Sequence, residues 1–269
     1  MSRFRLIATA CLVATVLVGH AATVAQETES KAQDLPSGLE VLQRYTKVTG
    51  GADNYKAIKT LTTEAMLSIP QMDIGGTIDM AMAPGGKMQF VVEIDGVGKQ
   101  VMGSDGKHVW AIAGITGARL LEGDEANQLR GRAELTRYYA PKEVFSKIEN
   151  RGVVDVDGKP AYEVEVTRKS GAEETEYYDV ESGLLVKSKI MAMVHGAGEL
   201  EITTLSEKYT EVGKLKFPFR QVQILPGGNE QVVEFVSYKF NEEIPDSRFV
   251  PPAEVKELID AEADKAPAP

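Results

Sequence analysis

Apolar and polar residues alternate along most of the chain from Leu61 onward. Five segments between residues 61 and 113 follow this pattern, and turn sequences rich in Gly, Pro and Asp separate them. A period of two is typical of β-strands, and short turns favour antiparallel hairpins. The same pattern resumes after residue 150 and continues to residue 240. We therefore expect about 10–12 antiparallel strands.

A helical pattern precedes the strands. Within residues 37–51, apolar residues recur on one side of the expected helix. Ser37 and Glu40 have the spacing of a capping box, and Gly50 and Gly51 are typical of a helix end. The pattern predicts one amphipathic helix of about three turns.

Three further stretches are expected to be helical. Residues 53–59 predict a short helical turn. Residues 120–148 are rich in helix formers, with Asp124 as the expected N-cap and Pro141 between two short helices. A last helix, with one apolar side, is expected after residue 252.

The segment from Leu185 to His195 shows how the strands distribute their side chains. One side carries Val186, Ser188, Ile190, Ala192 and Val194, and the other carries Leu185, Lys187, Lys189, Met191, Met193 and His195. Several strands place apolar residues on both faces, so both faces need cover. The expected fold is α+β and mainly antiparallel β: a single curved half-barrel sheet with helices covering its concave face. Such a fold can leave an apolar cavity.

The N-terminus has the features of a secretory signal peptide. The sequence MSRFR carries two arginines, a 13-residue apolar stretch runs from Leu6 to Val18, and small residues up to Ala21 or Ala25 suit cleavage. A bilayer span takes roughly 20 residues, so we expect a soluble, exported protein without stable membrane insertion. The expected parts are a signal peptide at 1–25, a flexible segment at 26–36, one domain at 37–260 and a disordered tail at 261–269.

The composition excludes several kinds of chemistry and partner. The only cysteine, Cys11, lies in the leader, where too few apolar residues precede it to favour lipid attachment. The mature chain therefore has neither disulfides nor thiolate ligands. Removal of residues 1–25, which contain Arg3 and Arg5 but no acid, changes the formal charge from -10 to -12. This acidic balance argues against nucleic acid as a partner.

No catalytic or metal motif stands out. The chain has no G-x-S-x-G, no H-E-x-x-H and no phosphate-binding glycine loop. His108 and His195 lack neighbours at metal-ligand spacing. The sequence DVDGKP at 155–160 resembles the start of a calcium loop, but the later ligands are missing, so a type I′ turn is the better interpretation. We predict no catalytic residue, no metal and no cofactor.

Soft apolar side chains are the candidate ligand-binding residues. Methionine is unbranched and polarisable, so it suits an adaptable wall around an apolar ligand, although it also commonly fills core gaps. The candidate lining consists of Met66, Met80, Met82, Met88, Phe90, Met102, Trp110, Met191 and Met193. Lys187 and Lys189 share a side with two of these methionines, where they either meet an anionic headgroup or form a solvated face.

Six segments, taken in order, resemble the LolA-like family of outer-membrane lipoprotein-sorting proteins. They are VTGGADNYKAIKTLTTEAML, GSDGKHVWAIAG, VVDVDGKPAYEVEV, EYYDVESGLLVKSKI, VGKLKFPFRQV and DSRFVPP. The resemblance extends over roughly residues 37–259. It implies a half-open β-barrel closed by helices, with an apolar cavity that holds acyl chains or a lipidated polypeptide in the periplasm.

The resemblance implies a non-enzymatic periplasmic carrier or binder of lipid or lipoprotein that delivers its cargo toward the outer membrane. We expect this protein to be a monomer. One alternative is an envelope-assembly or structural protein that uses the same fold to bind a protein partner without a lipid cargo. A third hypothesis is an enzyme whose paired carboxylates come from distant parts of the sequence.

Overall fold

The computed structural model describes residues 35–114, 116–194 and 198–264. The predicted signal peptide at 1–25, most of the segment at 26–36, His195 and the end of the predicted tail lie outside these residues. Across the described ranges, no helix is long and apolar enough to cross a membrane.

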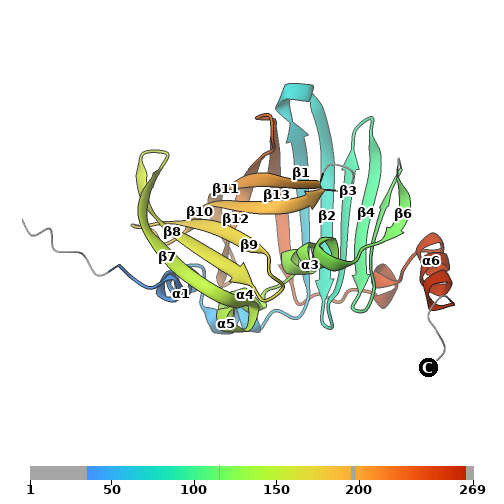
Figure 1. Cartoon of the computed structure of the whole chain (residues 1–269), viewed down its shortest axis with the longest axis horizontal. Helices are drawn as coiled ribbons and strands as arrows, with labels where there is room; N and C mark the ends of the chain where they lie inside the picture. The colour runs from blue at the N-terminus through green and yellow to red at the C-terminus, as the bar shows by residue number, and fades with distance from the viewer. Residues whose placement is uncertain (1–34, 115, 195–197, 265–269) are drawn as a thin grey trace, which may run out of the picture. The chain divides into compact units, whose positions relative to one another are not determined.

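The strands form one antiparallel sheet (Figure 1). They are β1 (Leu61–Ile69), β2 (Ile74–Ala83), β3 (Lys87–Ile94), β4 (Gly98–Asp105), β5 (Val109–Ala113), β6 (Gly117–Leu120), β7 (Phe145–Val156), β8 (Lys159–Arg168), β9 (Glu173–Asp179), β10 (Leu185–Val194), β11 (Gly198–Val212), β12 (Leu215–Ile224) and β13 (Glu230–Phe240). The order across the sheet is β6-β5-β4-β3-β2-β1-β13-β12-β11-β10-β9-β8-β7. Neighbouring strands in the sheet are also consecutive in the sequence except at one seam, where β1 pairs with β13, and β6 and β7 lie at the two edges of the sheet.

The predicted fold class is confirmed: the sheet is a curved half-barrel that does not close, and helices accompany it. The described strands number 13, against the 10–12 expected. The additional strand is β6, whose four residues are too few to show alternation in the sequence.

Helices accompany the strands in the described residues. They are α1 (Gly38–Val48), α2 (Ala52–Lys56), α3 (Gly123–Arg132), α4 (Thr136–Tyr139), α5 (Pro141–Val144) and α6 (Ala253–Ala263), with two 3-10 helices, η1 (Pro70–Met72) and η2 (Asp246–Phe249). The helix α1 begins with the predicted capping box: Ser37 Oγ accepts from the Glu40 N–H at 3.3 Å, and the Ser37 N–H donates to Glu40 Oε2 at 2.7 Å.

The prediction for residues 120–148 was partly wrong. Pro141 does separate two short helices, because it opens α5 directly after α4. Asp124 is not the N-cap, since Glu122 holds that position without a side-chain cap bond and Asp124 lies in the first turn of α3. The strand β7 begins at Phe145, so the last residues of the stretch are extended rather than helical.

Alternation gives the sheet two distinct faces. In β1, Leu61, Thr63, Ala65 and Leu67 are buried on one side. Directly opposed residues in antiparallel strands share a face, so the register carries this assignment from strand to strand. We call the face that carries these four residues the inner face and the opposite one the outer face.

Helices α1 to α5 cover parts of the inner face. Tyr45 of α1 belongs to one buried cluster with Val164 of β8, while Leu129 of α3 belongs to another with Met88 of β3. The helix α4 contacts α1, α2 and α5. The helices α1, α4 and α5 lie toward the β7–β8 end of the sheet (Figure 1).

The outer face is covered near the other end of the sheet by the C-terminal segment. Gln89, which follows the inner-face residue Met88, donates its Nε2–H to the carbonyl oxygen of Arg248 in η2 at 3.0 Å. The helix α6 contacts β6 (Figure 1). The helical cover is therefore divided between the two faces and is not confined to the concave one.

Candidate functional site

A row of soft apolar side chains crosses the inner face from β2 to β5. Met80 pairs with Phe90, Phe90 with Met102, and Met102 with Ala111. The register connects this row to Thr63 of β1, so it lies on the inner face. All four members of the row itself are only partly buried. The row is an apolar surface that the rest of the protein leaves partly accessible.

The neighbouring row belongs to the packed core. Met82 pairs with Met88, and their side chains are only 7% and 1% exposed. Ala126 and Leu129 of α3 lie in the same buried cluster and cover this row. Met82 and Met88 therefore fill the core, whereas Met80 and Met102 in the adjacent row remain partly accessible.

Met66 does not belong to this surface. It lies on β1 between the inner-face residues Ala65 and Leu67, so alternation turns its side chain to the outer face, where it is 53% exposed. Its pairing partners are Thr77 and Glu234. Met66 therefore lies on the opposite face of the sheet from Met80, with which the sequence analysis grouped it as candidate lining.

Trp110 also lies on the outer face. It pairs with Gly103, which pairs with Gln89, and these residues form the side opposite to Met88 and Met102. The ring lies directly over Gly103, since a Cβ built on that glycine would be 2.5 Å from the indole carbons. Trp110 is 1% exposed, so it is a buried core residue on the outer face of the sheet.

Met191 and Met193 share their side with Lys187 and Lys189, as predicted, but this side is the outer face. The inner face of β10 carries Ile190, which pairs with Glu174 of β9. Met191 is 47% exposed. The inner-face group of candidate residues is therefore Met80, Met82, Met88, Phe90 and Met102.

The segment of residues 123–140, which contains α3, α4 and the residues around them and which we call the strap, crosses the inner face. The helix α3 contacts both β5 and β10, which stand far apart in the strand order, so the sheet curls around the strap. The Gln128 side chain connects α3 to β10: its Nε2–H donates to the Met191 carbonyl oxygen at 3.3 Å, and its Oε1 accepts from the Met193 N–H at 3.0 Å.

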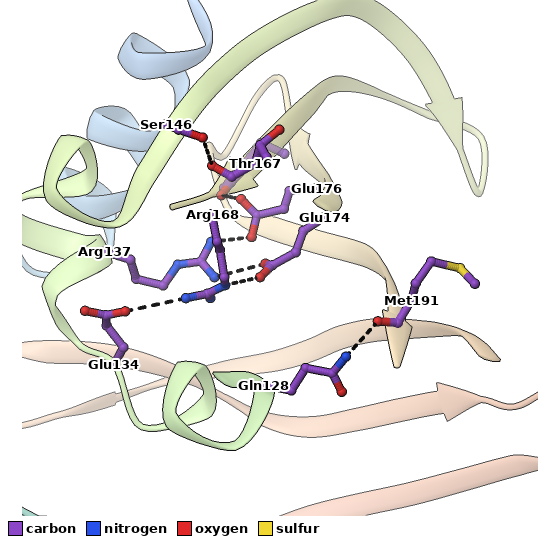
Figure 2. Close-up of polar contacts among 10 residues, drawn as sticks. Gln128, Glu134, Arg137, Ser146, Thr167, Arg168, Glu174, Glu176 and Met191 are labelled. Atoms are coloured by element: carbon purple, nitrogen blue, oxygen red, sulfur yellow. Dashed lines mark hydrogen bonds and ion pairs between the residues drawn. The ribbon is translucent and has the colours of Figure 1, made fainter. Parts of the chain in front are cut away.

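A group of charged side chains holds the strap to β8 and β9 (Figure 2). Arg137 of α4 pairs with Glu176 and, at 3.4 Å, with Glu174. Arg168 of β8 pairs with Glu174 and, at 3.5 Å, with Glu134 of the strap. We call these five residues the ionic cluster. It carries two positive and three negative formal charges, drawn from the strap and from two strands.

Four of the five members of the ionic cluster are well buried. The side chains of Arg137, Arg168 and Glu174 are 12–14% exposed, and that of Glu176 is 2% exposed. The Tyr178 hydroxyl donates to Glu176 at 2.7 Å. A buried charge is tolerated only when it is paired and hydrogen-bonded, and each of these groups meets that condition.

The charges of the ionic cluster reinforce one another. Burial alone would raise the pKa of Glu174, but Arg137 and Arg168 outweigh it and hold the pKa below its ordinary value. Burial alone would lower the pKa of Arg137, but Glu176 and Glu174 raise it above its ordinary value. In the described part of the chain, no group of three or more His, Cys, Asp or Glu side chains is arranged to hold a metal ion.

Sequence reasoning missed the ionic cluster and Gln128. A weak signal was present in the segment EETEYYD, where alternation places Glu174 and Glu176 on the same side as Tyr178. Carboxylates in a strand normally mark the solvated face, and the arginine that pairs with both comes from a helix about 40 residues earlier in the sequence.

The arrangement as a whole is a curved antiparallel sheet with a helical strap across its inner face. No family model and no curated protein matches the sequence. Among solved structures, the LolA superfamily protein NE2245 from Nitrosomonas europaea matches with a TM-score of 0.54 and 14% identity, over 81% of this chain and 99% of that one. A DUF1329 family protein from Desulfovibrio piger matches with a TM-score of 0.53 and 12% identity, over 80% and 98% of the two chains. The resemblance expected from the sequence is therefore confirmed at the level of the fold.

Proposed function

We propose that this protein is a non-enzymatic carrier that binds lipid acyl chains, free or as part of a lipoprotein, on the inner face of its sheet. It acts in the periplasm and delivers its cargo toward the outer membrane. The observation that carries the proposal is the partly accessible row of Met80, Phe90 and Met102 next to the strap.

An accessible apolar row on the inner face is costly unless something covers it. Water contact with apolar side chains is unfavourable, and each acyl methylene that such a surface buries gains about 0.8 kcal/mol. Methionine side chains adapt to ligands of different shape because they are unbranched and have three rotatable bonds. A wall of this kind suits a carrier, which has to accept a flexible chain and later release it.

The sequence supports the proposed location. Two arginines, an apolar stretch and small residues within 1–25 are the features of a leader for export. The fold shared with a LolA superfamily protein supports the proposed class of cargo, because the sequence resemblance to that family implies acyl-chain transport.

A neutral apolar fluorophore, N-phenyl-1-naphthylamine, tests the proposed surface. The wild-type protein is expected to enhance its fluorescence, and the double variant Met80→Gln/Met102→Gln is expected to bind it about five-fold more weakly, because polar amides replace apolar contact area. Met66→Gln is the matched control, since Met66 is the same residue type on the outer face of the same sheet. Thermal melting verifies that each variant is folded.

Two results would count against the proposal. Absence of binding by the folded wild-type protein would remove the apolar surface as a ligand site. Equal weakening by Met66→Gln would place the fluorophore elsewhere. As a second test, native mass spectrometry of protein extracted without detergent is expected to show co-purifying lipid, whereas bare protein that takes up no added lipid would contradict a carrier role.

A further inference from the structure

The ionic cluster adjoins apolar inner-face residues of β10 and β11, which β12, β13 and β1 separate in the strand order from the row that begins at Met80. Glu174 pairs across the β9–β10 ladder with Ile190, and Ile190 pairs with Ile202 of β11. Both isoleucines are partly buried. An acyl chain that lies along this part of the inner face would therefore bring its polar end close to the guanidinium groups of Arg137 and Arg168.

The five members of the ionic cluster are not held equally. The Glu134 side chain is 36% exposed, against 12–14% for Arg137, Arg168 and Glu174. Glu134 also makes the longest contact, at 3.5 Å from Arg168 Nη1. A long ion pair with one partly exposed partner contributes little stability. Glu134 is thus the carboxylate that most readily leaves the cluster.

The Arg168 guanidinium indicates what can take the place of Glu134. Without Glu134, the remaining members have two positive and two negative formal charges. The Nη1 group of Arg168 would then lack its ion-pair partner in a largely buried environment, and an unpaired buried donor is unfavourable. An incoming anionic group would give Arg168 Nη1 a partner of the same charge as the Glu134 carboxylate.

We propose that Arg168 binds the anionic headgroup of the protein's amphiphilic ligand in the position that the Glu134 carboxylate occupies in this structure. The inference rests on the proposed function, since the acyl chain of the same ligand packs on the inner face. The ligand class is a lipid with a carboxylate or phosphate at one end. Guanidinium groups suit both, because their planar N–H donors match the oxygens of either anion.

Three probes with the same hydrocarbon chain separate headgroup from chain binding. Oleyl alcohol is neutral, oleate carries a carboxylate, and oleoyl lysophosphatidic acid carries a phosphate. Their affinities are measured at fixed ionic strength by displacement of N-phenyl-1-naphthylamine. The two anionic probes together show whether the site prefers a carboxylate or a phosphate.

Glu134→Gln removes the competing carboxylate from a partly exposed position, so the fold is not at risk. The variant is expected to bind both anionic lipids about two- to five-fold more tightly than the wild type, with unchanged affinity for oleyl alcohol. Glu173→Gln is the matched control, because it removes an exposed negative charge next to Glu174 and outside the cluster. Arg168→Gln is expected to abolish the preference for anionic lipids while binding of oleyl alcohol persists.

The outcomes are distinct. If Glu134→Gln leaves the affinity for anionic lipids unchanged, or if Glu173→Gln raises it equally, the headgroup site is refuted while chain binding stands. Persistence of the anionic preference in folded Arg168→Gln also refutes it. If the wild-type protein binds none of the three probes, the proposed function itself fails.

Discussion

The side-chain amide of Gln128 in α3 lies beside the backbone of Met193 in β10, where its Oε1 accepts the Met193 N–H at 3.0 Å. The same amide donates to the carbonyl oxygen of Met191. The ladder between β9 and β10 ends at Ile190, so Gln128 continues the hydrogen bonding that a neighbouring strand would provide. A helix of the strap thereby completes the edge of a strand.

Substitution of Gln128 should change hydrogen exchange at one identifiable amide. In Gln128→Ala, the Met193 N–H loses its acceptor, and a hydrogen bond of this kind contributes about 0.5–1.5 kcal/mol. Protection of that amide is expected to fall roughly two- to ten-fold in NMR-detected exchange. Gln128→Glu keeps an acceptor oxygen and should retain the protection. Equal loss in both variants would show that the amide is protected by other means.

Gly103 should not tolerate a side chain. A Cβ at this position would lie 2.5 Å from the Trp110 ring, so Gly103→Ala has to displace a buried indole. Overpacking of this kind costs about 1–3 kcal/mol, measurable by urea unfolding. Gly114→Ala serves as the control, because nothing lies within 4 Å of the added Cβ and it should change stability little. Similar stability of both variants would contradict the position of Trp110.

Two methionine truncations should separate the faces of the sheet. Met88→Ala removes a side chain that is 1% exposed and is expected to cost about 2–5 kcal/mol of unfolding free energy. Met66→Ala removes one that is 53% exposed and is expected to stay within about 0.5 kcal/mol of the wild type. Chemical denaturation measures both, and the reverse order would mean that the face assignment is wrong.

Acid should weaken the ionic cluster. Arg137 and Arg168 hold the pKa of Glu174 below its ordinary value, so the folded state binds this proton less readily than the unfolded state. The contribution of Glu174 to stability is therefore present above about pH 4.3 and is lost as the pH falls below it.

The pH effect is measured as the change in urea midpoint between about pH 6 and pH 3. Glu174→Gln cannot titrate and is expected to show a smaller decrease than the wild type, although it is less stable at neutral pH. Glu173→Gln, outside the cluster, should behave as the wild type. An unchanged decrease in Glu174→Gln would indicate that other carboxylates dominate the acid response.

The sequence predicted the positions of the strands well, but it did not predict which side of each strand faces inward. Alternation identified the hairpins around Met80 and Phe90, and the turn chemistry of DVDGKP predicted the tight turn in which Asp157 and Gly158 both have positive φ. Alternation also grouped Met191 with Lys187 correctly. It could not say which side of β10 was inward, because both sides carry apolar residues.

The choice of the inward side depends on contacts from distant parts of the chain. On β9 and β10 the inner face carries Glu174 and Glu176, while Met191 is exposed on the outer face. The two strands together reverse the usual preference for apolar side chains inside and charged side chains outside. The reversal is possible because Arg137 arrives from α4 with the opposite charge, and no local pattern in β9 records that arrangement.

The seam between β1 and β13 determines when the sheet can be completed. Every other pairing joins strands that follow one another in the sequence, and such local contacts form quickly. The seam instead joins Leu61 to Phe240, so it waits until nearly the whole chain has been synthesised. Until then β1 presents an unpaired edge that strands of other chains can join. The greatest risk of misassembly therefore falls in that interval, before the last strand arrives, rather than in the finished protein.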